Sequence, residues 1–307
     1  MKDPKTLDEM IGIFEERGLA LDDKDIDSFR TVLYDCNYYR LSGYFRAFQV
    51  DPSHGDNRFV EGTCVDDFLT PYLMDERLRS LVFEGTSRLE RTIGARFSYL
   101  LAQNDGAYSY IDENSYNEYR TVSDKNAALS QFPSRQSPRS QLFNELCRWL
   151  SQSKEVCIRH YRRRNQPVPI WAAVEAIPFG TLSKMLSLHK NTQVLRELYK
   201  SLGFRGREWR TCAPSAIQSM SYLRNMCAHH SRLWKREIIS APPMPQGAQQ
   251  QFSSMEFSDK SVAKSLVVLS YLVDYIAGDE EYSLRLWEFV NSDASYSDGI
   301  HHAAHWE

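Results

Sequence analysis

The sequence LRSLVFEGTSRLERTIGARFSYL, residues 78 to 100, gives the clearest indication of the fold. Its large apolar residues recur at steps of three, four or seven positions, and they are Leu78, Val82, Leu89, Ile93, Phe97 and Leu100. With 3.6 residues per helical turn, this spacing places them on one face. Other positions lie elsewhere on the helix, and they include Arg79, Glu84, Ser87, Arg91 and Ala95. The stretch therefore predicts a long amphipathic α-helix with a buried stripe.

The same periodicity recurs along most of the chain. A second long helix is expected where five apolar residues share a face, namely Val262, Leu266, Leu269, Val273 and Ile276. Ser258-Asp259 is expected to cap its start and Gly278 to end it. Shorter helices are expected at about residues 6–17, 24–34, 140–163, 181–190 and 207–226. Because no run alternates as a half-buried strand would, we expect an all-α fold.

Three polar stretches interrupt the helical pattern. Residues 51–62 include Asp-Pro-Ser-His-Gly-Asp-Asn, a sequence typical of a loop. Residues 242–251 link two later helices, and residues 105–138 are polar, rich in Tyr and expected on the surface. We predict an N-terminal helical unit over 1–60, a helical domain over 61–295 and a flexible tail over 296–307.

Composition places the chain among globular proteins but does not identify a partner. Of 307 residues, 42% are apolar and 25% charged, which suffices for a self-supporting core. The formal net charge is −3, so a polyanion would have to be held by a local basic patch.

The cysteines and the N-terminus indicate an intracellular protein. The six cysteines form no C-x-x-C pair or zinc motif, and we interpret them as reduced thiols. MKDPKTLDEMIG lacks the layout of a signal peptide, and no stretch approaches the roughly 18 apolar residues of a membrane span. We therefore expect a cytoplasmic protein without a membrane partner.

Arg224 stands on a face that should be buried. Ala213, Ile217 and Met220 form an apolar stripe, and the same steps continue to Arg224 and Cys227. An unpaired buried guanidinium is prohibitively costly, so Arg224 must meet a carboxylate, line a polar cleft or face a partner subunit. Candidates for a supporting carboxylate are Glu84, Glu90 and Glu175.

The residues after Arg224 could carry chemistry on a phosphodiester. Asn225, His229, His230 and Arg232 add an amide, two imidazoles and a second cation. Internal RNA cleavage needs a base, an acid and a cation on the phosphorus, and His and Arg supply these without a metal. However, His229 lies about 140° around an ideal helix from Arg224, so the two converge only if the helix ends, bends or meets a second copy.

A wider set of motifs resembles a known family. Arg224-Asn225-x-x-x-His229 is similar to the R-x4-6-H signature of HEPN ribonucleases, and LRNMCAHHSRLW, residues 223–234, resembles Abi-like abortive-infection proteins of the AbiD/AbiF type. Three further segments match that family: YYRLSGY at 38–44, DERLR at 75–79 leading to RLE at 88–90, and WAAVE with FGTLS at 171–183. Departures from the pattern are Lys235, where Asn is usual, and Gly94, where a longer side chain is common.

The resemblance implies a HEPN-type helical bundle that forms a homodimer and cleaves single-stranded RNA in bacterial phage defence, without a metal or cofactor. The products would carry 2′,3′-cyclic phosphate and 5′-hydroxyl ends. Arg224 would stabilise the phosphorane, His229 would act as general base or acid, and Asn225 and His230 would orient them. Two alternatives stay open: a non-catalytic RNA-binding protein with a small non-coding RNA partner, and the toxin of a toxin–antitoxin pair.

A basic segment supplies a separate candidate for RNA binding. Residues 135–164 hold eight basic residues against two acidic ones, with Trp149 and Tyr161 among them. Cations near aromatic rings suit phosphate contacts and base stacking, although a solvated helix end would look the same. We predict RNA contacts, together with Arg232, from Arg159, Arg162, Arg163 and Arg164. The tail histidines, His301, His302 and His305, have metal-like spacing, but we expect no metal there.

Overall fold

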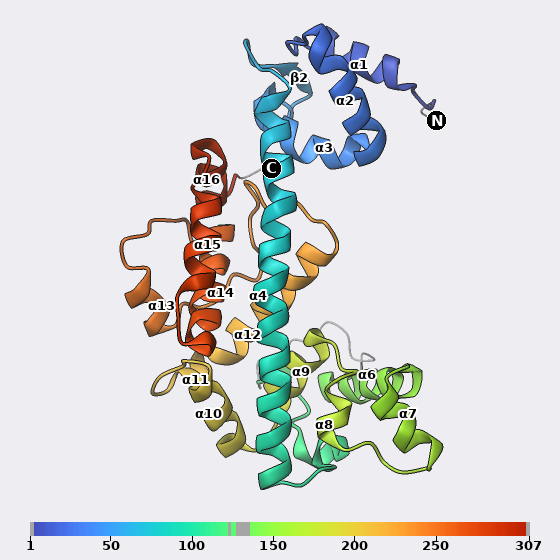
Figure 1. The fold of residues 1–307 in the computed structure, drawn as a ribbon, viewed down its shortest axis with the longest axis vertical. Coiled ribbons are helices and arrows are strands. Elements are labelled where there is room, and N and C mark those ends of the chain that lie inside the picture. The colour runs from blue at the N-terminus through green and yellow to red at the C-terminus, as the bar shows by residue number, and fades with distance from the viewer. Residues whose placement is uncertain (1–2, 122–123, 127–135, 305–307) are drawn as a thin grey trace.

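Helix α4, Asp66–Asn104, is the axis of the molecule in a computed structural model that describes residues 3–121, 124–126 and 136–304. The other helices surround it along its length (Figure 1). Leu78, Val82, Leu89, Ile93 and Phe97 are fully buried, as their spacing predicts, because helices pack on that face. Leu100 is half-buried, and Leu101 takes the buried position. The all-α fold class is therefore confirmed.

An N-terminal unit packs around the first turns of α4. It consists of α1 (Leu7–Glu16), α2 (Asp23–Cys36), α3 (Tyr38–Phe45), the 3-10 turn η1 (Arg46–Phe48) and the strands β1 (Gln49–Asp51) and β2 (Asp56–Phe59). Its aromatic core joins Phe14 to Phe29, Phe45 and Phe59, and Phe68 of α4 packs against three of these rings. The unit is thus attached to α4 through a shared core.

The remaining helices cover the two sides of α4. After the turns η2 (Ser109–Ile111) and η3 (Glu113–Ser115), α6 to α9 lie together near its C-terminal half, and α14 to α16 run along the opposite side (Figure 1). Helix α12 crosses between them and packs on both α4 and α9. Their bounds are α6 (Pro138–Gln152), α7 (Val156–Arg163), α8 (Ile170–Ala173), α9 (Phe179–Leu188), α10 (Thr192–Ser201), α11 (Glu208–Thr211), α12 (Ala213–Ala228), α13 (Gln246–Gln251), α14 (Val262–Ala277), α15 (Glu281–Val290) and α16 (Ala294–His301).

Several local expectations need correction. The stretch 51–62, expected as a loop, contributes to a two-stranded antiparallel hairpin. The helix expected at 140–163 is divided between α6 and α7, and the cap of α14 is Ser261 and not Ser258-Asp259, because the Ser261 hydroxyl accepts the Lys264 amide hydrogen. Gly278 ends α14 as expected, in the left-handed conformation with φ of 79°.

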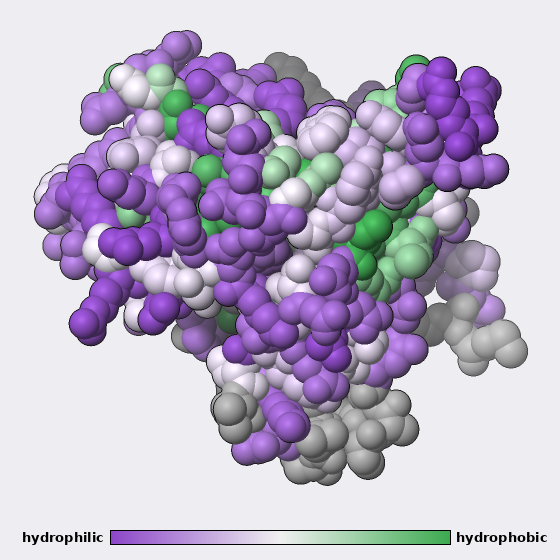
Figure 2. Space-filling view, turned by 90° about the horizontal axis from the view of Figure 1, so that it is seen from below, coloured by the Kyte–Doolittle hydropathy of each residue, from purple (hydrophilic) through white to green (hydrophobic). Residues whose placement is uncertain are grey.

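The flexible tail expected over 296–307 is wrong for its first six residues. Helix α16 continues to His301, and Tyr296 and Ile300 are buried because they pack into the core. His305 and the rest of 305–307 lie outside the described residues, as do Arg135 and its neighbours back to residue 127. Figure 2 shows that hydrophilic residues cover most of the face seen from below, around a few small hydrophobic patches.

Candidate active site

The end of α12 presents both imidazoles to solvent. The helix ends at Ala228, and His229 is its C-cap, with its amide donating to the Asn225 carbonyl at 3.0 Å. His230 then adopts the left-handed conformation with φ of 54°, which turns the chain away from the helix axis. Both histidines are exposed. The helix therefore persists up to His229, and the chain turns only after it, so the angular separation between Arg224 and His229 remains.

Arg224 lies in a partly buried position facing α4. Its side chain is 29% exposed, and its Nε lies 3.8 Å from Glu90 Oε2. Its guanidinium carbon is 5.4 Å from the centre of the Phe83 ring, and Nη1 donates to Asn225 Oδ1 at 3.2 Å. Within the described residues, the buried Nε has no hydrogen-bond partner. Arg224 is thus held in place but keeps unused donor capacity.

Glu90 is the carboxylate that faces Arg224, and two other motif segments meet it. Burial raises the pKa of Glu90, while Arg224 and the backbone amide of Phe179 lower it to a smaller extent. Gly180 follows at the start of α9, where an added Cβ would lie 3.6 Å from Ser221 Oγ of α12. The segment 179–183 is therefore placed against both Glu90 and the helix that carries Arg224.

Asp75 anchors the chain that follows the histidines. The carboxylate is fully buried on α4 and accepts hydrogen bonds from the backbone amides of Leu233 at 2.7 Å and Trp234 at 3.1 Å. The hydroxyls of Tyr44 and Tyr296 donate to it at 2.7 Å each. One side chain thus joins α3, α4, the segment after α12 and α16.

The groups around Asp75 are arranged to donate. Burial and the Asp75 carboxylate raise the pKa of Tyr44 and of Tyr296, so both phenols stay protonated. Burial raises the pKa of Asp75 itself, and the hydrogen bonds from Leu233, the two phenols and Trp234 oppose that shift. The two amides and the two phenols each donate a hydrogen bond, and the Asp75 carboxylate is the acceptor that satisfies these buried donors.

Three arginines approach the segment between His230 and Trp234. Arg40 of α3 donates to the His230 carbonyl, and Arg79 of α4 donates to the Ser231 carbonyl at 3.3 Å and lies 3.8 Å from Asp75 Oδ2. Arg232 packs on Gly43, where an added Cβ would lie 3.4 Å from Arg232 Cδ. Burial lowers the pKa of Arg232, and its Nη1 has no hydrogen-bond partner among the described residues.

Some expected site residues are not brought together. Among the described residues, no hydrogen bond or ion pair joins Arg224 to His229 or His230. Glu84 pairs with Arg285, and Glu175 is exposed, so neither faces Arg224 as a supporting carboxylate.

The apolar stripe of α12 packs inside the chain and does not form a surface for a second subunit. Ala213, Ile217 and Met220 are fully buried against the chain's own helices, so they cannot form the surface of a subunit interface. Burial raises the pKa of Cys227 to about 12, and all six cysteines are free thiols. Cys227 is therefore a packing residue within the motif.

The basic residues expected to contact RNA lie on other elements. Arg159, Arg162, Arg163 and Arg164 are exposed on and after α7, whereas Arg232 is half-buried beside α3. Within the described residues, no group of three or more His, Cys, Asp or Glu side chains is placed to hold a metal ion. None of the helices in those residues is long and apolar enough to cross a membrane.

Residue patterns alone did not single out the Asp75 network. Asp75 stands in the motif at 75–79 and Tyr44 in the motif at 38–44, but Tyr296 falls in the segment expected to be a flexible tail. An available signal was that Asp75 lies three residues before Leu78, on the extension of the buried stripe.

Comparison with known proteins identifies a family for this chain. The model of a family described as Abi-like protein matches residues 31–235, about two thirds of the chain. The matched range includes Arg40, Asp75, Glu90, Arg224 and His229, and it ends one residue after Trp234. No curated protein and no solved structure matches.

Proposed function

Because the chain belongs to the family of Abi-like proteins, whose function is of the abortive-infection type, we propose that it is an RNA endonuclease acting in bacterial phage defence. It would cleave single-stranded RNA internally without a metal and leave 2′,3′-cyclic phosphate and 5′-hydroxyl ends. The fold would be a HEPN-type bundle that acts as a homodimer.

The observation that supports this proposal best is the state of Arg224. Its guanidinium is held between Phe83 and Glu90, yet its buried Nε has no hydrogen bond within the described residues. Burial raises the pKa of Glu90, and the charge of Arg224 opposes that shift. A phosphate oxygen that approaches the exposed part of the Arg224 side chain, 29% of its surface, would gain a charge-assisted hydrogen bond.

The reaction follows from the groups at the end of α12. An imidazole, His229 in our assignment, takes the proton of the 2′-hydroxyl, and the 2′-oxygen bonds to phosphorus. The bond from phosphorus to the 5′-oxygen then breaks, and that oxygen receives a proton from an imidazolium. Arg224 stabilises the charge on the phosphorane oxygens, while Asn225 and His230 orient these groups.

A second copy of the chain would bring the separated groups together. Arg224 and His229 belong to one helix end, and no hydrogen bond or ion pair joins them among the described residues. Phe83 beside Arg224 leaves 42% of its surface exposed. A twofold axis at this face would cover Phe83 and place one subunit's histidines near the other's arginine. This arrangement would resolve the angular separation of Arg224 and His229 on the helix.

End-group analysis of the cleaved RNA tests the proposal. We expect purified protein to cut single-stranded RNA in EDTA and leave cyclic phosphate and 5′-hydroxyl ends, because the proposed groups need no metal. Arg224→Ala and His229→Ala should each lower the rate by at least about 100-fold. Arg91→Ala is the matched control, since Arg91 is exposed on α4. Products with 5′-phosphate ends, or full activity in both variants, would refute the mechanism.

Mixed dimers test the shared site. Wild-type chains co-expressed with an excess of His229→Ala chains should lose activity per wild-type chain, because most would pair with a damaged partner. The shared site would be refuted if the protein is monomeric at micromolar concentration or keeps full activity in verified heterodimers. Each site would then belong to one subunit.

A further inference from the structure

The corner between α6 and α7 gathers exposed cations. Helix α6 ends at Gln152, residues 153–155 turn the chain, and α7 carries Arg159, Arg162 and Arg163 with Lys154 and Arg164 at its flanks. All five are exposed, whereas Ile158 is fully buried and fixes α7 to the body of the protein. A short amphipathic helix thus holds one apolar anchor inward and its arginines outward.

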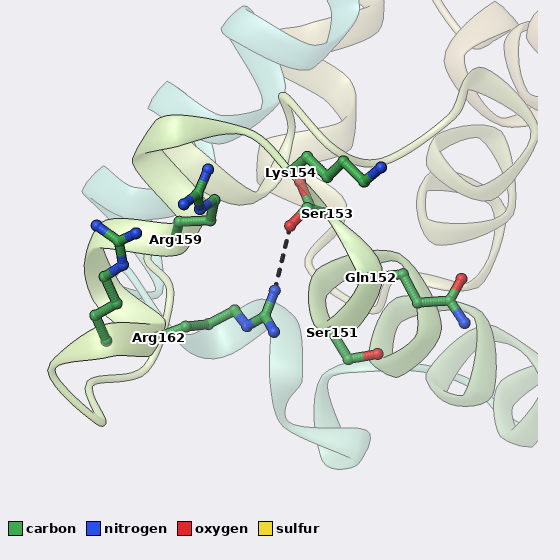
Figure 3. A pocket seen from close by; sticks show the side chains of 7 residues that line it. Ser151, Gln152, Ser153, Lys154, Arg159 and Arg162 are labelled. Atoms are coloured by element: carbon green, nitrogen blue, oxygen red, sulfur yellow. Dashed lines mark hydrogen bonds between the residues drawn. The ribbon is translucent and has the colours of Figure 1, made fainter.

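These cations line a pocket at the corner. It has a volume of about 620 Å³, and Lys154, Arg159, Arg162 and Arg163 line it together with residues 151–153. Figure 3 shows Arg159 and Arg162 on one side and Lys154 with residues 151–153 on the other, with Arg162 Nη1 donating to the Ser153 carbonyl at 3.2 Å. No carboxylate lines this pocket among the residues that the structure describes.

The cationic surface continues around α7. A second pocket of about 400 Å³ is lined by Val156, His160 and Arg164 and shares Arg159 and Arg163 with the first. The two pockets therefore form one track along the helix. Two adjoining cationic pockets suit an extended polyanion better than a single phosphate, which would occupy one of them.

The charges of this track are not neutralised within the chain. In the part of the chain that the structure describes, none of Lys154, Arg159, Arg162, Arg163 and Arg164 forms an ion pair with a carboxylate. The whole chain has a formal net charge of −3, so this is a local concentration of positive charge against the overall sign. Clustered like charges repel each other, and a polyanion would relieve that repulsion.

An exposed aromatic ring on the helix next to α7 favours nucleic acid over other polyanions. Trp171 on α8 is 52% exposed, and α7 packs against α8. Cations that contact phosphates, combined with an indole on which a base can stack, are the usual means of binding single strands.

We propose that the α6–α7 corner is a binding site for the backbone of single-stranded RNA, formed by elements other than those around Arg224. The identification of the polyanion as RNA rests on the proposed function, whereas the affinity for a flexible polyanion rests on the pockets. The site retains a substrate strand while the end of α12 cuts it.

Binding to a fluorescent 20-nucleotide oligouridylate tests this inference. We would use the His229→Ala protein, so that binding is measured without cleavage. Arg159→Glu with Arg163→Glu should weaken binding by about tenfold or more. The slope of log K against log salt should become shallower by about 0.7 for every phosphate that the variant no longer neutralises. Arg196→Glu with Lys200→Glu on α10 is the matched control, because these exposed cations have the same spacing and charge change.

The outcomes separate this site from the proposed chemistry. Loss of RNA binding in the α7 variant but not in the α10 variant, with unchanged circular dichroism, supports the site even if the wild type never cleaves RNA. Lys154→Glu provides a second variant at an exposed position before the helix. Equal binding by the α7 variant and its parent would overturn the inference. Binding of the parent to anionic lipid vesicles but not to oligouridylate would also overturn it.

Discussion

Two carboxylates of α4, Asp75 and Glu90, differ in their burial and in the number of donors that they accept. They are 15 residues apart, or roughly 22 Å along the helix. Asp75 is fully buried and accepts four hydrogen-bond donors from three other parts of the chain. Glu90 is 21% exposed and faces one guanidinium at 3.8 Å.

The difference separates a carboxylate that several donors satisfy from one that is only partly paired. A buried charge is tolerated when its neighbours satisfy it, and Asp75 meets that condition by joining segments up to 221 residues apart. Glu90 is desolvated but poorly paired, and so is Arg224 beside it. Unsatisfied polar groups at a partly exposed position are a cost to stability that a ligand can relieve.

Asp75→Ala should produce the largest effect. It leaves two amides and two phenols without their acceptor, and Arg79 loses its ion-pair partner, so we expect a loss of about 3–5 kcal/mol in unfolding free energy. Urea denaturation followed by circular dichroism measures it. Asp66→Ala, at an exposed position of the same helix, should change stability much less. Similar stabilities for the two variants would show that Asp75 is not the anchor.

Tyr296→Phe should have an intermediate effect. The change removes one donor to the Asp75 carboxylate without altering the ring, and a hydrogen bond to a charged group contributes about 1.5–3 kcal/mol. Tyr99→Phe is the control, because Tyr99 is 66% exposed on α4. If thermal unfolding shows no difference between the two variants, α16 is not held through Asp75.

Glu90→Gln should have the smallest effect on stability, with a distinctive pH dependence. The raised pKa of Glu90 means that the folded state holds this proton more tightly than the unfolded state, whose value is near 4.5. The wild type should therefore lose stability relative to the variant as pH rises from about 4.5 through the folded pKa, by less than about 1 kcal/mol. Urea titrations between pH 4 and 8 measure this difference. A wild type that gains stability over this range would show that folding lowers the pKa of Glu90 and does not raise it.

The stripe from Leu78 to Phe97 was predictable because helical periodicity is a local property of the chain. The short helix α3 and the break between α6 and α7 were not predictable from the sequence. The length of a short helix and the position of a turn depend on tertiary packing. The hairpin of β1 and β2 was missed because its strands are only three and four residues long. The role of Tyr296 was also not predictable from local patterns, since its partner Asp75 is remote in the sequence.

Side-chain spacing and chemistry, which are local properties of the sequence, predict that this chain is helical and that Arg224 needs a partner. The grouping of residues 223–234 with the motifs at 38–44, 75–79 and 171–183 rests on the resemblance to a family. Three features became known from the folded chain alone: Glu90 faces Arg224, Asp75 accepts the amides of Leu233 and Trp234, and the arginines of α7 point outward. These outcomes depend on how long helices pack, because burial and the distances between remote residues exist only in the folded chain.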